Sequence, residues 1–225
     1  MTKSHGWQDV TYASYDDLPK NVQSYDNETW VQKQTDRLKN IDEELEIIKT
    51  RNSLLIEYVN KYDKNNISIL DYGGGIGLTY FSLLATTNKT IDYNIVELPS
   101  MCDAGQNADV PIKFYQNIPN KKFDIVYIRT SLQYSKDWKK TLSDLVKFSP
   151  KYIIFAHLSA SDMSTYLTLQ MWGDYLIPYW FINKQELFDH IRKYNYNISH
   201  LENSYEIPTP LKSKTLDLVY TRGRI

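Results

Sequence analysis

Hydrophobic positions return along this chain at two different spacings. Between residues 26 and 62 they recur mostly every three or four positions, which predicts amphipathic helices. After residue 62, short apolar runs alternate with amphipathic segments. The runs predict strands at 67–71, 93–97, 112–115, 123–128 and 152–157, and the segments predict helices at 78–86, 100–106, 138–148 and 184–194. This alternation predicts a parallel sheet with right-handed crossovers.

Two last strands are predicted at 200–206 and 216–221, around Pro208 and Pro210, with no helix between them. Such a hairpin adds one antiparallel strand. We therefore expect an α/β fold with a mostly parallel, seven-stranded sheet. We divide the chain into an N-terminal helical cap, residues 1–62, and a domain that holds the sheet, residues 63–225. We expect the cap to cover the carboxyl edge of the sheet, because its helical pattern continues to the first strand without linker-like composition.

A glycine-rich loop follows the first predicted strand. A dinucleotide fingerprint, G-x-G-x-x-G, would place its third glycine at position 78, which is a leucine. The chain instead reads Asp-x-Gly-x-Gly-x-Gly through Asp71, Gly73, Gly75 and Gly77. Glycines allow the backbone to approach a ligand closely, and the following helix directs free amides at it. The alternative is a tight strand-to-helix turn that binds nothing.

The second predicted strand ends in an acid, Glu97, which lies 20 positions after Gly77. Nucleotide-binding α/β units place an acid at this distance for a ribose diol, because a carboxylate accepts strong hydrogen bonds from both hydroxyls. A solvated surface glutamate is the other interpretation, but Leu98 and Pro99 follow directly after an apolar run. We expect Glu97 and Leu98 to belong to the cofactor site together with the glycine loop.

The glycine pattern resembles motif I of the class I methyltransferases that use S-adenosyl-L-methionine (SAM). Residues 124–138 resemble the fourth strand and following loop of these enzymes, where Ser131 and its neighbours line the cofactor cleft. Over about residues 25–220 the chain resembles a bacterial family of methyltransferases associated with surface-polysaccharide gene clusters. The resemblance implies a Rossmann-like class I fold and a SAM-dependent methyl transfer, and it names no acceptor.

One position departs from the family pattern. Many relatives carry an acid after the third strand that contacts the adenine amino group, whereas this chain has Gln116 and Asn117. Either amide can still accept one hydrogen bond there, and we expect Asn117 in the cofactor site.

Transfer of a methyl group to oxygen usually needs a base that removes the acceptor's proton. His157 ends the predicted strand 152–157, at the edge of the sheet where ligands bind in open α/β folds. It is our candidate base, although a histidine packed at a strand end is an equal alternative. Asp162 is a second candidate and could equally cap a helix.

Aromatic residues are frequent between positions 166 and 181. They could form the wall of an acceptor pocket for a sugar or another ring, or pack in the core or against a second copy in a homodimer. No Asn-Pro-Pro-Tyr-like sequence follows the fourth strand, which argues against methylation of nucleobase amino groups. We therefore expect O-methylation of a small molecule or of a sugar in a surface-polysaccharide precursor. The alternative is a non-catalytic SAM- or nucleotide-binding module, or an interaction protein on a methyltransferase fold.

Composition narrows the remaining classes. The 225 residues carry a net charge of −1, so no overall field favours nucleic acid or an anionic membrane. The single cysteine, Cys102, excludes an internal disulfide and suits a reducing compartment. Histidines and the cysteine show no metal-ligand spacing, and we expect no metal. Neither a signal-peptide core nor an apolar stretch of about 18 residues occurs, which predicts a cytoplasmic protein.

Overall fold

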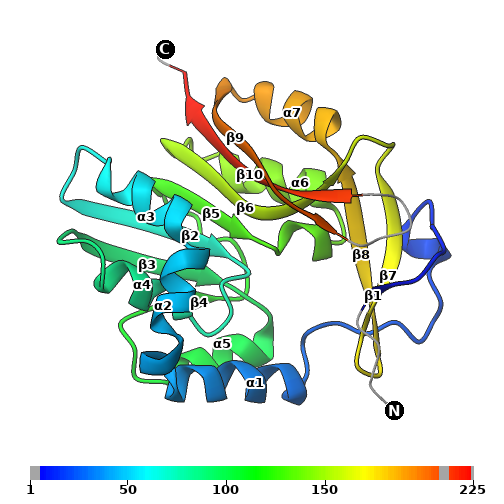
Figure 1. Cartoon of the computed structure of the whole chain (residues 1–225), viewed down its shortest axis with the longest axis horizontal. Coiled ribbons are helices and arrows are strands. Elements are labelled where there is room, and N and C mark those ends of the chain that lie inside the picture. The colour runs from blue at the N-terminus through cyan, green and yellow to red at the C-terminus, as the bar shows by residue number, and fades with distance from the viewer. Residues whose placement is uncertain (1–5, 208–212, 224–225) are drawn as a thin grey trace.

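A twisted sheet with helices on both faces forms the centre of the molecule (Figure 1). The computed structural model describes residues 6–207 and 213–223, and the predicted turn at Pro208 and Pro210 lies outside this part of the chain. Its strands are β1 Gly6–Trp7, β2 Asn66–Tyr72, β3 Thr90–Val96, β4 Lys113–Tyr115, β5 Ile125–Arg129, β6 Tyr152–Ser161, β7 Tyr166–Trp172, β8 Tyr175–Asn183, β9 Tyr196–Ile207 and β10 Ser213–Arg222. Its α-helices are α1 Glu28–Lys39, α2 Ile41–Arg51, α3 Ser53–Asn60, α4 Leu78–Leu84, α5 Pro99–Gln106, α6 Trp138–Val146 and α7 Lys184–Arg192.

The predicted strands form one continuous array in the order β4-β3-β2-β5-β6-β10-β9. The neighbours from β4 to β6 are parallel, and β10 is antiparallel to both β6 and β9. The predicted order of strands and helices from residue 67 onward is thereby confirmed to within a few residues. Side chains cap the starts of α1, α6 and α7. Asn183, for example, accepts a 2.9 Å hydrogen bond from the Glu186 amide at the start of α7.

The predicted number of seven strands is wrong, because the described residues contain ten. The β7–β8 hairpin lies between β6 and α7, β1 pairs with β7, and the end of β8 pairs with β6. The prediction of a single antiparallel strand is wrong for the same reason. Gly173 and Asp174 connect the two hairpin strands as a two-residue turn, with a positive φ of 61° at Gly173. A Gly-Asp pair between two apolar runs was the signal for this hairpin.

Strand β6 is longer than predicted. Pairing with β5 ends at Ala156, but β10 and then β8 continue the ladder to Ser161. His157 therefore lies inside the strand, at an irregularity where its φ is +52° and the β10 register shifts. His157 is nevertheless one residue beyond the β5 ladder, beside Thr130, whose amide donates to the Ala156 carbonyl at 3.2 Å.

The N-terminal helices differ in what they cover. Leu55 and Val59 of α3 are completely buried against the sheet, so α3 covers a face and not the carboxyl edge. Helix α2 packs on α4, and α1 lies beside α5 at the carboxyl ends of the strands (Figure 1). Helix α1 and the last residues of α2 do lie at the carboxyl edge, because they line a cavity together with residues 73–75 and Arg129. The division at residue 62 stays a prediction. The opposite face of the sheet is covered by α6 and α7 through residues such as Leu142 and Leu187.

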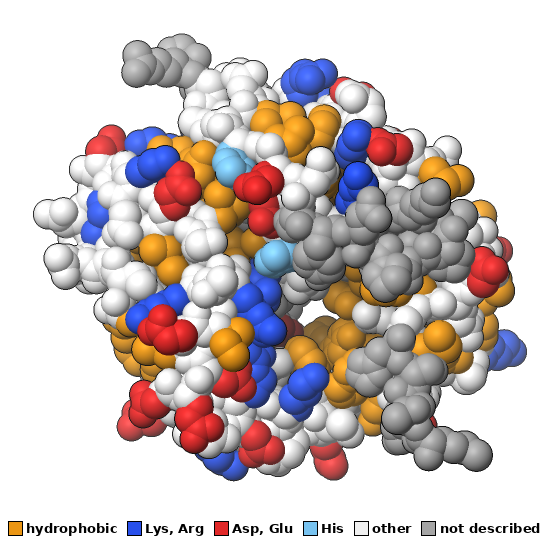
Figure 2. All heavy atoms as spheres, in the orientation of Figure 1, with side chains coloured by type: hydrophobic (Ala, Val, Ile, Leu, Met, Phe, Trp, Pro, Cys, Tyr) orange, Lys and Arg blue, Asp and Glu red, His pale blue; other side chains and the backbone are white. Residues whose placement is uncertain are grey.

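The face seen in Figure 1 is hollowed near its centre, as its space-filling view shows (Figure 2). None of the described helices is long and apolar enough to cross a bilayer.

Candidate functional site

The loop between β2 and α4 depends on its glycines. Gly73, Gly75 and Gly77 have positive φ values of 72°, 59° and 92°, a region that side chains with a Cβ rarely adopt. At Gly73 a Cβ would also overlap the Cβ of Ser131, so the loop passes directly against the segment after β5. Ser131 in turn donates a hydrogen bond from Oγ to the Tyr72 carbonyl. Two predicted cofactor segments are thereby held together.

Glu97 joins the end of β3 to the same loop. Its Oε1 accepts a hydrogen bond from the Gly75 amide at 3.0 Å, and its Oε2 accepts one from the Leu98 amide at 2.8 Å. Burial raises the pKa of Glu97, while these two backbone hydrogen bonds act in the opposite direction. The glycine loop and Glu97, both predicted to bind the cofactor, are therefore in direct contact, although Gly75 and Glu97 lie 22 residues apart in the sequence.

Asp71 lies beneath the loop. It is only 1% exposed and accepts a 2.6 Å hydrogen bond from the Tyr93 hydroxyl. A Cβ at Gly74 would meet its carboxylate, so the loop rests on this side chain. Burial raises the pKa of Asp71 to about 7, against the effect of the Tyr93 hydrogen bond. Asp71 thus supports the loop from below and does not line the larger cavity described next.

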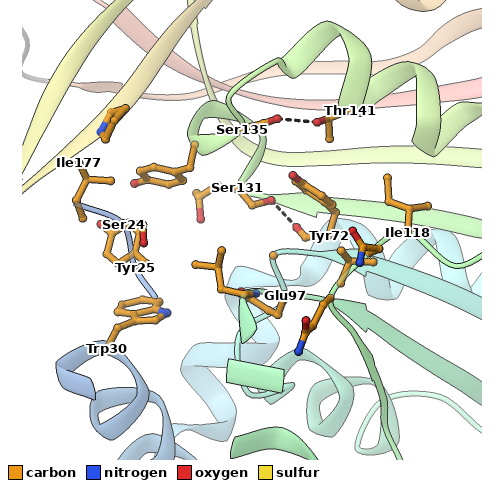
Figure 3. A pocket seen from close by; sticks show the side chains of 18 of the residues that line it. Ser24, Tyr25, Trp30, Tyr72, Glu97, Ile118, Ser131, Ser135, Thr141 and Ile177 are labelled. Carbon is orange, nitrogen blue, oxygen red and sulfur yellow. Dashed lines mark hydrogen bonds between the residues drawn. The ribbon is translucent and has the colours of Figure 1, made fainter. Parts of the chain in front are cut away.

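A cavity of about 920 Å³ opens at the carboxyl ends of β2, β3 and β5 (Figure 3). Ligand pockets typically measure about 300–1,000 Å³, so this cavity lies near the upper end of that range. Five of the eight predicted cofactor residues line it: Gly73, Glu97, Leu98, Asn117 and Ser131. Gly75 and Asp71 line a smaller cavity behind the loop, and Gly77 caps α4.

Aromatic rings form the side of the larger cavity that faces the cofactor residues. In Figure 3, Tyr25 and Trp30 stand across the cavity from Glu97 and Tyr72. The Tyr25 and Tyr134 rings meet edge to face at 5.1 Å between centroids. Their hydroxyls donate to the same Gln170 Oε1 on β7, at 2.9 and 2.8 Å respectively. The rings are therefore fixed in place by the β7–β8 hairpin.

Most aromatic residues of the predicted run at 166–181 do not line the cavity themselves, and some of them support the rings that do. Tyr179 and Phe181 are buried in the core, and Trp172 braces Tyr25 and Trp30 at centroid distances of 5.4 and 5.8 Å. Of the residues between 166 and 181, Ile177 and Pro178 line the cavity itself. The core interpretation is thus correct for Tyr179 and Phe181, and a subunit contact stays a prediction.

The smaller cavity, of about 140 Å³, shares Trp30, Gly73, Arg129 and Thr130 with the larger one. It lies between the glycine loop and helices α1 and α2. We call it the arginine cavity, because Arg37, Arg51 and Arg129 all line it.

The two candidate bases have different surroundings. His157 donates its backbone amide to Asp217 Oδ1 at 2.7 Å, and burial lowers the pKa of its imidazole. It lines neither cavity, although Thr130, the residue that follows the adjacent strand β5, lines both. Asp162 is exposed beyond the end of β6 and forms an ion pair with Lys184 of α7. The structure therefore does not bring Asp162 to either cavity. Among the described residues, no group of three or more His, Cys, Asp or Glu side chains is arranged to hold a metal ion.

Comparison with known proteins decides the family. A family model described as a methyltransferase domain matches residues 42–201, well over half of the chain. This chain belongs to that methyltransferase family. No curated protein matches it significantly by sequence.

The methyltransferase fold also recurs in solved structures. One is the Burkholderia thailandensis 1,6-didemethyltoxoflavin-N1-methyltransferase, with its substrate and S-adenosylhomocysteine bound. It is 12% identical, with a TM-score of 0.54, covering 92% of this chain and 94% of that one. Another is the magnesium protoporphyrin IX methyltransferase of Synechocystis with bound S-adenosylhomocysteine, at 13% identity, a TM-score of 0.57, and coverage of 88% and 96%. A SAM-dependent methyltransferase from Clostridium acetobutylicum is 13% identical, with a TM-score of 0.55 and coverage of 84% and 99%. At these identities the similarity shows a shared Rossmann-like fold.

Several residues around the cavities of this methyltransferase domain escaped prediction. Tyr25 and Trp30 precede the matched region, and nothing in their local sequence links them to Gln170 or Trp172, some 140 residues away. Arg129 had a usable signal, since it is a charged residue that ends an apolar strand at the ligand-binding edge.

Proposed function

We propose that this chain is a SAM-dependent methyltransferase that methylates an oxygen atom of a small-molecule acceptor. The observation that carries the proposal is the contact between the Gly75 amide and Glu97, which lines the larger cavity of about 920 Å³. A strand-to-helix turn that bound nothing would not need an acid, three left-handed glycines and an adjoining cavity at one place.

The residues present fit the cofactor. Glu97 offers two carboxylate oxygens at the end of β3, suited to the two hydroxyls of a ribose. Leu98 and Asn117 stand beside it on the cavity wall and would receive the adenine. Gly73 and Ser131 also line the cavity and would lie along the amino-acid portion. When bound, the cofactor supplies a methyl group on a positively charged sulfur.

A small-molecule acceptor is supported by the aromatic wall of Tyr25, Trp30 and Tyr134, since flat rings pack well on a sugar or another ring. A sugar of a surface-polysaccharide precursor is one such acceptor, and only the family resemblance points to it. Holding the acceptor against this wall is itself catalytic, because fixing two reactants in position can be worth about 7–11 kcal/mol.

We propose His157 as the base. Its register places it one residue beyond the β5 ladder, beside Thr130 of the cavity wall. Because burial lowers its pKa, the imidazole is neutral near pH 7 and can accept a proton. Asp162 is not part of this proposal, because its carboxylate is paired with Lys184 away from both cavities.

Calorimetry with SAM and with NAD tests the cofactor and separates the alternatives. We expect binding of SAM and none of NAD. SAM binding without turnover on any acceptor would favour a non-catalytic module, and binding of neither would favour an interaction protein. Turnover is then screened with methyl-labelled SAM on sugars, nucleotide-activated sugars and ring compounds, and the methylated atom is located by NMR. A methyl group on nitrogen or carbon would refute the oxygen assignment.

His157→Ala tests the base with the acceptor found by that screen. We expect kcat to fall by about 10²-fold or more, with unchanged SAM affinity, because general-base catalysis contributes about 10²–10⁴-fold. His190→Ala is a matched control, since His190 lies on α7 and contacts Ser143 at 3.0 Å. Full activity of His157→Ala would exclude this residue as the base, and loss of SAM binding would mark it as structural.

A further inference from the structure

Arg129 ends β5 between the two cavities and lines both of them. Its Nε atom is buried and has no hydrogen-bond partner within residues 6–207 and 213–223. None of the ion pairs formed within this part of the chain includes Arg129. A buried donor on a charged group is costly when it is left without an acceptor. Such a group in a cavity wall therefore points to a ligand that supplies the acceptor.

The acids around Arg129 are engaged elsewhere. Asp71 accepts the Tyr93 hydroxyl at 2.6 Å beneath the glycine loop. Burial raises the pKa of this carboxyl, and the charge of Arg129 acts in the opposite direction without an ion-pair contact. Glu97 accepts the two backbone amides of the cofactor site. Asp217 accepts the His157 amide at 2.7 Å. No described carboxylate is thus left in ion-pair contact with the guanidinium, whose flat fork of donors matches the oxygens of a carboxylate or phosphate.

A second arginine lies on the same side of the loop. Arg51, the last residue of α2, is exposed and lines the arginine cavity with Arg129. Arg37 lines it too, but its guanidinium pairs with Glu44. Figure 2 shows Lys and Arg side chains gathered along one rim of the central hollow, with hydrophobic side chains on the other. An anion that enters the arginine cavity would therefore meet two cations, Arg51 near solvent and Arg129 inside.

We propose that Arg129 binds a carboxylate or phosphate group of a bound ligand, with Arg51 as the outer cation. This inference rests on the proposed function, because the cavities it joins are those of the methyl-transfer site. Two ligands could carry the group: the cofactor, through the carboxylate of its amino-acid portion, or an acceptor that is itself acidic. The second source would define the acceptor class as acidic sugars or phosphorylated compounds.

The experiment compares Arg129→Gln and Arg129→Lys with wild type by calorimetry. Arg192→Gln is the matched control, because Arg192 is an exposed arginine of α7 that bonds Asp189 at 3.3 Å. The probes are S-adenosylhomocysteine and 5′-methylthioadenosine, which has the same adenosine and thioether but no carboxylate. Inorganic phosphate is titrated into protein saturated with S-adenosylhomocysteine. We expect Arg129→Gln to lose at least tenfold in affinity for one anionic probe, Arg129→Lys to lose less, and methylthioadenosine binding to stay unchanged.

Each outcome has a definite meaning. Weaker S-adenosylhomocysteine binding with unchanged methylthioadenosine binding identifies the cofactor's carboxylate as the partner. Weaker phosphate binding with unchanged S-adenosylhomocysteine binding identifies an acidic acceptor. Unchanged affinity for both anionic probes would overturn the inference, as would an equal loss for methylthioadenosine, which would show a merely structural residue. If the wild type bound neither nucleoside, the proposed function would fail, and phosphate binding to the free protein would still test Arg129.

Discussion

The larger cavity has two sides that are built differently. One side consists of the ends of the parallel strands β2, β3 and β5, where Gly73 and Glu97 follow directly after a strand and Ser131 is the second residue after one. The opposite side consists of Tyr25, Trp30 and their neighbours, which are attached to the β7–β8 hairpin. We call these the cofactor side and the aromatic side.

The cofactor side is held together by hydrogen bonds between two side chains, Glu97 and Ser131, and backbone groups of the neighbouring strand ends and loop. The aromatic side is held together by side chains from distant segments that meet at Gln170 and Trp172. A motif that uses backbone geometry demands particular residues at fixed spacing. A wall of side chains can be assembled from any segment that the fold brings near. We therefore expect the cofactor side to determine which cofactor binds and the aromatic side to determine which acceptor binds.

The largest effect is expected from Gly73→Ala. The new Cβ would overlap Ser131 in a backbone conformation with φ of +72°, so the loop must shift and SAM affinity should fall by at least ~10²-fold, about 2.7 kcal/mol. Calorimetry measures this, with folding checked by circular dichroism. Gly6→Ala is the control, because a Cβ there would lie 3.7 Å from Met171 in ordinary contact. Wild-type affinity in Gly73→Ala would show that the cofactor side tolerates a different loop.

Glu97→Ala should weaken SAM binding by about ten- to a hundredfold, since a hydrogen bond to a charged group contributes about 1.5–3 kcal/mol. The variant also leaves the Gly75 amide without its carboxylate partner. Glu46→Ala, an exposed residue of α2 paired with Lys49, serves as control. Unchanged SAM affinity in folded Glu97→Ala protein would remove Glu97 from the cofactor side.

Asp71→Asn should change how stability depends on pH. The folded-state pKa of Asp71 is raised to about 7 from an ordinary 3.8, so the unfolded chain loses this proton first as pH rises. The contribution of Asp71 to the free energy of unfolding is therefore largest below the ordinary pKa. It falls as the pH rises to about 7, by at most ~1.4 kcal/mol per pH unit. Urea denaturation across this window should show the variant gaining stability relative to wild type as pH rises. A difference that does not vary with pH would contradict this account of the loop's support.

Gln170→Leu should act on the aromatic side alone. It removes the acceptor shared by the Tyr25 and Tyr134 hydroxyls, which should cost about 1 kcal/mol of unfolding free energy. SAM affinity should stay at the wild-type value, while the KM for the acceptor should rise. Adding Tyr134→Phe should recover part of the lost stability, because it removes one of the two hydroxyls that Gln170→Leu leaves without this acceptor. A loss of SAM affinity in Gln170→Leu would show that the two sides are coupled.

Much of the cofactor side could be predicted because its signals are local. The apolar run before Asp71, the glycine spacing after it and the acid 20 positions beyond Gly77 are each contained in one segment. The same local reasoning failed at β6, where pairing with β10 and β8 carries the strand four residues past His157. It failed again at residues 166–183, where a dense aromatic run concealed the hairpin.

The sequence by itself determined the order in which parallel strands and helices alternate along the chain, the glycine loop, and its partner Glu97. Backbone conformation and strand burial depend mainly on neighbouring residues, which is why these features could be predicted. Only the tertiary structure decided which rings face the cofactor side, that Asp71 lies under the loop, and that Arg129 ends between two cavities with no hydrogen-bond acceptor for its Nε among the described residues. These facts depend on which side chains from distant segments meet in the folded chain, and a local pattern of residues does not fix that.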